Sequence, residues 1–193
     1  MSFHLHVCFG QQLIAGEYGV GLTLAYDNET NRVTGYFENY TGWDESAKAP
    51  RFSCIFYLEG ILKNDSVKIK TFYPADKSED MIDGLMRLVD NKTVALTLLE
   101  DHGGCWNVQR FKDEPVTFYI EKQKPWQQIR YVTSAKSYFY ADQSIDKKLK
   151  SYLTKHTIVY IEQLEKEWAY CIFEGKKTIK GWIHLSDLNV LEK

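Results

Sequence analysis

Short segments of alternating apolar and polar residues, separated by residues that favour turns, run through most of this chain. The clearest case is Tyr18 to Tyr26, which is followed by the turn formers of Asp27 to Asn31. Residues Arg32 to Tyr40 alternate again and predict the returning strand of a hairpin. Because successive side chains of a strand point to opposite faces, this pattern favours sheets that bury one face.

The same pattern continues to about residue 122. Proline lacks a backbone N–H, so Pro74 marks the end of one strand. About eight strands at close spacing predict an antiparallel β barrel or sandwich over residues 13–122. The remaining expected strands are Phe52 to Leu62, Ser66 to Tyr73, Leu85 to Val89, Thr93 to Leu99, a strand that resumes at Trp106 to Val108, and Val116 to Glu121.

A second unit follows the short polar linker Lys122 to Pro125. Its landmarks are, in order, Ile129 to Val132, Lys155 to Ile161, Trp168 to Phe173 and Gly181 to Leu188. This order resembles the bacterial SH3-like (SH3b) domain, which has a Lys-Gly turn before a Val-rich strand and a Gly-Trp-Val/Ile strand near its end. The resemblance covers residues 126–193 and implies a small all-β barrel that binds ligands without chemistry of its own.

Two features of this second unit depart from the SH3b pattern. His156 stands where the family usually has glycine, and the segment from Tyr138 to Tyr152 is longer and more charged than usual. The sequence as a whole therefore predicts an all-β chain, with an antiparallel barrel or sandwich followed by a small SH3-like barrel.

The composition and the distribution of charge bear on what the chain could bind. Aromatic residues make up 15% of the chain, which favours strands and binding surfaces. The net charge of −2 gives no reason to expect nucleic-acid binding. Residues 1–125 carry a net charge of −5 and residues 126–193 a net charge of +3. Opposite charges would help the two units pack, and ordinary solvated faces are the other interpretation.

The cysteines and the first residues bear on the compartment. Cys54 and Cys105 both lie in the first unit, and a disulfide between them would suit an exported protein. Cys171 lies in an alternating strand and is expected to be a buried thiol. Residues 1–12 resemble the tail of a secretory signal peptide, and a plain first strand is the alternative. We therefore expect a periplasmic or otherwise extracytoplasmic protein.

Two groups of residues are candidates for binding a partner. Tyr40, Trp43, Asp44 and Glu45 follow an expected strand, where aromatic and acidic side chains on a loop are typical of recognition. The alternative is that Trp43 folds back onto the end of the barrel. The second group is Tyr138, Tyr140 and Tyr152, in or beside an expected long loop of the SH3-like unit.

Sites for chemistry are less well supported by the sequence. His102 lies three residues before Cys105, but a disulfide to Cys54 would remove the thiol that such a pair needs. No Cys-x-x-Cys or His-x-x-x-His spacing suggests a metal site, and no cofactor motif is evident. No apolar stretch reaches the 20 or so residues that span a bilayer.

The leading hypothesis is a non-catalytic, exported bacterial binding protein. In its most specific form it is an inhibitor or immunity protein that neutralises a secreted antibacterial effector through protein–protein contact. The first alternative is a module that binds cell-wall (peptidoglycan) peptides, which is what the SH3b resemblance implies. Further alternatives are a carrier of small ligands and an envelope hydrolase that uses Cys105 or a pair of carboxylates from among Asp44, Glu45, Asp101 and Asp113.

Overall fold

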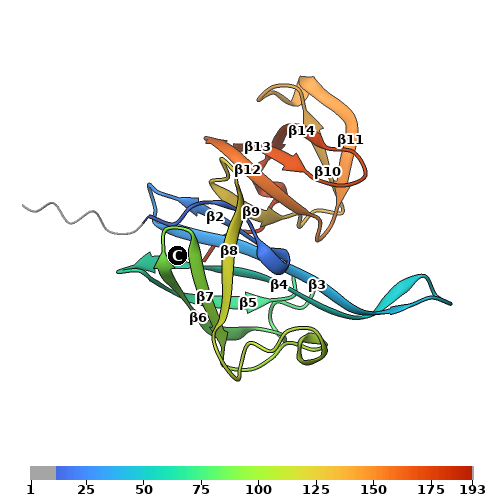
Figure 1. Cartoon of the computed structure of the whole chain (residues 1–193). Helices are drawn as coiled ribbons and strands as arrows, with labels where there is room; N and C mark the ends of the chain where they lie inside the picture. Colours follow the sequence, from blue (N-terminus) through green and yellow to red (C-terminus); the bar gives the residue numbers. More distant parts are fainter. Residues whose placement is uncertain (1–11, 193) are drawn as a thin grey trace, which may run out of the picture.

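The computed structural model describes residues 12–192, which form two β units (Figure 1). The first is a closed antiparallel barrel and the second a six-stranded sheet, so the predicted all-β fold is confirmed. The signal-like segment falls almost entirely on residues 1–11 and lies outside the described residues.

Eight strands form the barrel, each paired with the next, and the first strand closes onto the last. Of the two predicted forms, barrel or sandwich, the structure shows the barrel. Its strands are β1 (Gly16–Tyr18), β2 (Leu22–Asp27), β3 (Arg32–Asp44), β4 (Ala49–Lys63), β5 (Ser66–Phe72), β6 (Ile82–Asp90), β7 (Thr93–Leu98) and β8 (Val116–Gln123).

Aromatic side chains fill the middle of the barrel. The ring of Phe37 lies 5.1 Å from the rings of both Phe56 and Phe111 and 6.0 Å from that of Phe118. Buried aliphatic residues such as Leu22 join these rings into one continuous core. A small ligand would therefore have to displace side chains to enter, which distinguishes this barrel from one that encloses a ligand cavity.

The first expected strand, Tyr18 to Tyr26, is interrupted by the short 3-10 turn η1 (Gly19–Gly21). Gly21 has a φ of 89°, and a Cβ atom there would lie 2.1 Å from the carbonyl oxygen of Glu38. Only glycine allows the turn to approach β3 this closely. The predicted single strand is thus two strands, β1 and β2.

The second unit is a sheet with the strand order β11-β10-β14-β13-β12-β9. Its own core includes Phe139, Val159, Cys171 and Ile183. Burial raises the pKa of the Cys171 thiol, as expected for an inert core cysteine. The strands are β9 (Gln128–Tyr131), β10 (Lys136–Tyr140), β11 (Lys148–Thr154), β12 (Ile158–Glu165), β13 (Trp168–Phe173) and β14 (Ile179–His184).

The sequence landmarks of the SH3b resemblance fall in β9, in β12 and the turn before it, in β13, and in β14 with the turn η4 (Leu185–Asp187). His156, at the position where the family usually has glycine, has a φ of 68°, which is the left-handed region that glycine favours. Membership of the SH3b family stays a prediction.

The two units share a third core on the outside of the barrel. Tyr57 and Phe72 from the barrel pack against Trp126, Ile129 and Tyr131 from the linker and β9. Hydrogen bonds cross the same junction: the hydroxyl of Tyr57 donates to the carbonyl oxygen of Ile129 at 3.0 Å. The second unit is therefore seated on β2 and β3, with Tyr57 of β4 and Phe72 of β5 in the shared core (Figure 1).

Candidate functional site

Strands β3 and β4 continue beyond the barrel as a two-stranded arm (Figure 1). Strand β2 pairs only with residues 32–37 of β3, and β5 pairs only with residues 57–63 of β4. Beyond the Phe37–Phe56 pair, residues 38–44 of β3 and 49–55 of β4 pair only with each other. We call residues 38–56 the arm. Tyr40, Trp43 and Asp44 therefore lie on a strand rather than in the predicted loop, and Glu45 follows at the turn.

Polar bonds hold the turn at the tip of the arm. Asp44 Oδ1 accepts hydrogen bonds from the backbone N–H groups of Ser46 at 2.9 Å and Ala47 at 3.2 Å. The Nε and Nη2 atoms of Arg51 both donate to Asp44 Oδ2, at 3.0 and 2.8 Å. The Ser46 hydroxyl also donates to Asp44 Oδ1, at 2.6 Å. Together these hydrogen bonds, that from the Ser46 hydroxyl most of all, lower the pKa of the Asp44 carboxyl to about 2. The candidate residue Asp44 thus shapes the tip.

The base of the arm is tied to the loop that joins β7 and β8. The predicted disulfide between Cys54 and Cys105 is confirmed. Beside it, the hydroxyl of Thr41 donates to the carbonyl oxygen of Asn107 at 3.2 Å. Residues after Cys105, which were expected to resume a strand, form the 3-10 turn η2 (Cys105–Asn107) instead. The cross-link explains this difference, because it holds η2 against the arm.

Large apolar side chains are exposed along the arm and on η2. Trp43 is 61% exposed, so the alternative in which it folds back onto the barrel is wrong. Trp106 on η2 is also 61% exposed, and Tyr40 and Phe52 are exposed as well. An aromatic side chain on a stiff support is a typical anchor of a protein interface.

The end of the barrel that carries the arm is acidic. In an antiparallel barrel alternate connections lie at the same end, so residues 73–81 and 99–115 flank the arm. Contacts confirm this placement, since His102 in the second connection lies 2.9 Å from Asp80 in the first. We call residues 38–56, 73–81 and 99–115 the arm end. It holds ten Asp and Glu against five Lys and Arg.

His102 contacts β5 and the connection that follows it. Its Nε2 atom lies 2.7 Å from the Oγ1 atom of Thr71, and its Nδ1 atom lies 2.9 Å from Asp80 Oδ2 without hydrogen-bond alignment. The Thr71 hydroxyl donates to the carbonyl oxygen of Ile82 at 3.0 Å, so it accepts from His102. Thr71 is fully buried and its proton is engaged, which argues against a nucleophile.

Other groups that were candidates for chemistry are also engaged. Cys105 has no free thiol because it is bonded to Cys54. Asp101 accepts hydrogen bonds from the backbone N–H groups of Phe111 at 2.7 Å and Lys112 at 3.2 Å. Both residues therefore hold the loop of residues 99–115 in place.

The second candidate group lies on the outer face of the six-stranded sheet. Tyr138 and Tyr140 alternate in β10 with the buried Phe139, and Tyr152 lies in β11 opposite Tyr138. The expected long loop is thus shorter, because both of its ends are strands. Further aromatic side chains from β13 and β14 join them. We call this set the aromatic face: Tyr138, Tyr140, Tyr152, Trp168, Tyr170 and Trp182.

Ring contacts link the aromatic face, and lysines border it. The rings of Tyr138 and Tyr152 lie 5.6 Å apart, and those of Tyr170 and Trp182 lie 5.4 Å apart. The ammonium groups of Lys136 and Lys148 lie over Tyr152 and Tyr138, at 4.8 and 3.5 Å from the ring centres. Lysines thus border a mostly half-buried aromatic face, whereas the arm end is acidic.

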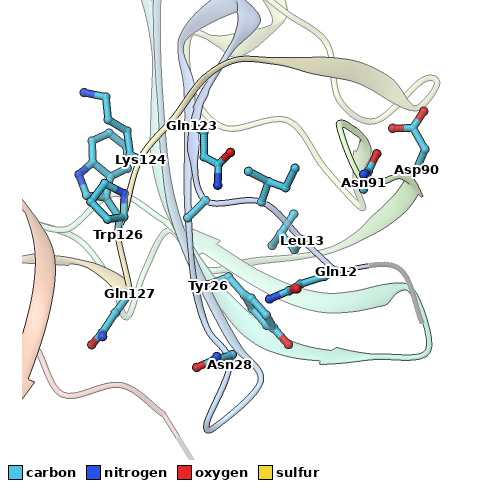
Figure 2. A pocket seen from close by; sticks show the side chains of 13 residues that line it. Gln12, Leu13, Tyr26, Asn28, Asp90, Asn91, Gln123, Lys124, Trp126 and Gln127 are labelled. Atoms are coloured by element: carbon cyan, nitrogen blue, oxygen red, sulfur yellow. The ribbon is translucent and has the colours of Figure 1, made fainter. Parts of the chain in front are cut away.

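A hollow of about 710 Å³ lies where the linker meets the barrel (Figure 2). Figure 2 shows Asp90 and Asn91 on one rim and Lys124 and Trp126 on the other. Trp126 is part of the core shared by the two units, and Lys124 pairs with Glu174 at 3.0 Å. Trp126 and Lys124 are thus already engaged in contacts between the two units.

Within residues 12–192, no cluster of three or more His, Cys, Asp or Glu side chains is arranged to hold a metal ion. The same residues include no helix with the length and apolar character needed to span a membrane. Comparison of the chain with protein-family models, curated proteins and solved structures finds no match.

Proposed function

We propose that this chain is a non-catalytic binding protein that neutralises an exported protein partner by docking its arm end against a basic cleft of that partner. The observation that carries the proposal is the arm itself, a projecting hairpin with an exposed tryptophan, Trp43, next to a turn fixed by Asp44. A projecting hairpin reaches into a concave site that a flat surface could not enter.

The stiffness of the arm supports a role in tight binding. Binding costs free energy when loops and side chains become ordered, and a preformed segment avoids much of that cost. Here the tip is held by Asp44 and Arg51, and the base by the disulfide and the Thr41 hydrogen bond. Trp43 is therefore presented in a fixed position, as an interface anchor requires.

The charge of the arm end supports the class of partner. A twofold excess of carboxylates would steer a basic cleft toward the arm and suppress binding to acidic surfaces. The disulfide suits an oxidising compartment, in keeping with the periplasmic or other extracytoplasmic location expected from the sequence. A secreted antibacterial effector with a basic active-site cleft fits both conditions.

The first experiment is an affinity capture from the envelope and culture fractions of the producing organism, read by mass spectrometry. The bound partner's own enzymatic activity is then measured with and without the protein. The proposal expects a stoichiometric partner whose activity falls on binding. A partner that keeps full activity would contradict neutralisation, and no captured protein at all would contradict the proposal as a whole.

Matched variants then test the surface. Trp43→Ala and Glu45→Gln should each weaken partner binding, the tryptophan change by about 2 kcal/mol or more, as for a typical interface anchor. Tyr119→Ala is the control, because Tyr119 is 64% exposed on β8, outside the arm end. Equal losses from Trp43→Ala and Tyr119→Ala would show that the arm is not the interface.

A second candidate function, binding of cell-wall peptides, is favoured by the aromatic face. Its clustered rings and bordering lysines suit an extended, partly anionic peptide, and the SH3b resemblance points the same way. Sedimentation with purified cell walls separates the two functions. A protein that pellets with walls, and whose Tyr152→Ala variant stays in solution, would favour this second candidate.

A further inference from the structure

The outer surface of the barrel has a hollow of about 410 Å³ on β3, β4 and β5, well away from the arm tip. The strand register defines its floor. Arg32, Ile61 and Lys68 are direct partners across the three strands and form one row. Glu59 and Lys70 lie in the next row, and the end of the chain adds Glu192 as a wall.

Glu59 is a buried carboxylate that lines this hollow and has one unfilled hydrogen-bond position. Its side chain is only 3% exposed, and Lys77 lies 3.4 Å from its Oε1 atom. The Oε2 atom is buried and has no hydrogen-bond partner within residues 12–192. A buried carboxylate oxygen without a donor is costly, so this position would favour a ligand that carries an N–H or O–H group.

Only some of the cations around the hollow are paired with carboxylates. Lys70 and Lys77 are engaged, because they pair with Glu192 at 2.8 and 3.2 Å. In the described part of the chain, by contrast, Arg32, Lys63 and Lys68 form no ion pair. All three line the hollow. An anionic ligand would find three uncommitted cations beside the unfilled position of Glu59.

We propose that this hollow binds an α-amino carboxylate, with the ligand's carboxylate on Arg32 and Lys68 and its N–H donor on Glu59. Adjacent rows on the same face are two residues apart, or about 7 Å along a strand. A donor and a carboxylate joined through one carbon, with a hydrogen bond at each end, span a similar length. The chemistry is shared by a free amino acid and by the last residue of a peptide.

The test is a titration of the isotope-labelled full chain followed by amide chemical shifts. Four probes separate the parts of the ligand: alanine, N-acetylalanine, acetate, which lacks the donor, and ethylammonium, which lacks the carboxylate. Alanine or N-acetylalanine should shift the amides of Gly60, Ile61 and Lys68 saturably at millimolar concentration. Acetate should bind about tenfold more weakly, because it leaves Glu59 without a donor.

Two variants and a control assign the contacts. Glu59→Gln should reduce the affinity for alanine toward that for acetate. Lys68→Gln should reduce the affinities for both alanine and acetate several-fold. Because Lys68 is exposed, its variant keeps the test valid even if Glu59→Gln fails to fold. Lys150→Gln changes an exposed lysine on the other sheet and should alter the affinity for neither alanine nor acetate.

The results with alanine, N-acetylalanine and acetate decide the outcome. Tighter binding of N-acetylalanine identifies a peptide end as the source, and tighter binding of alanine identifies a free amino acid. No saturable shift with either probe, or acetate binding as tightly as both, would overturn the proposal. Because the hollow is separate from the arm, neither result bears on the capture of a protein partner.

Discussion

At the scale of the residue, His156 carries a backbone conformation that its side chain disfavours. Its φ of 68° lies in the left-handed region, where a Cβ atom crowds the following carbonyl oxygen. We predict that His156→Gly is more stable than His156→Ala by about 1 kcal/mol, because alanine retains the Cβ atom. Urea unfolding of the two variants measures the difference.

A matched position gives the opposite ranking. Thr154 is the exposed last residue of β11 and pairs with Lys136 without a positive φ, and in a paired strand alanine is favoured over glycine by roughly 0.5–1 kcal/mol. Thr154→Ala should therefore be more stable than Thr154→Gly. If glycine were the less stable substitution at both positions, the strain assigned to His156 would be wrong.

Single residues also show where sequence reasoning succeeds and fails. The Cys54–Cys105 pair was predictable, because these are the two cysteines of the first unit, residues 13–122. The role of His102 was not, since Thr71 lies 31 positions away and nothing in the local sequence links them. The unfilled position of Glu59 depends on strand register in the same way. Long-range partners need the three-dimensional structure.

At the scale of the element, the arm was predicted only in part. The strand after Arg32 was expected to end at Tyr40, because the alternation of apolar residues stops there. Beyond that point no sheet covers the strands, so no apolar face is required and the pattern disappears. The hairpin persists because its two strands pair with each other and Asp44 holds the turn.

The order of the arm tip should depend on pH through Asp44. Its folded pKa of about 2 lies below the ordinary value of 3.8, so ionised Asp44 favours the folded turn. That contribution is complete above the ordinary value and is lost as the pH falls toward about 2. The amide shifts of Ser46 and Ala47 should titrate with this low midpoint. Asp44→Asn should abolish the transition, whereas a midpoint near 4 would contradict the assignment.

The disulfide stabilises the base of the arm and the whole barrel. Its cysteines are 51 positions apart, and closing a loop of that size is worth about 4 kcal/mol in the chain-entropy model. The double variant Cys54→Ser/Cys105→Ser should lose about that much in the free energy of unfolding. Reductant should destabilise the natural protein by a similar amount and leave the double variant unchanged. Equal sensitivity of both proteins would point to another cysteine.

At the scale of the whole molecule, the sequence predicts where the first unit ends and the second begins, but it does not predict how the two units contact each other. Lys122 to Pro125 was expected to be a linker, and the barrel does end at Gln123. The residues that join the units, such as Ile129 and Tyr131, resemble ordinary strand residues in the sequence. Only the structure shows that they bury against Tyr57 on the outside of the barrel.

The shared core should make the two units unfold together. Ile129 is fully buried in it, and its backbone N–H donates to the Thr34 hydroxyl at 2.7 Å while its carbonyl oxygen accepts from Tyr57. We predict one calorimetric transition, with equal calorimetric and van't Hoff enthalpies. Ile129→Ala should lower its midpoint by the equivalent of about 2–5 kcal/mol. Leu24→Ala, a matched change inside the barrel, should move the same single transition. Two separate transitions, each responding to only one variant, would contradict this prediction. The second unit would then have its own stability, and the arm and the aromatic face would belong to units that unfold independently.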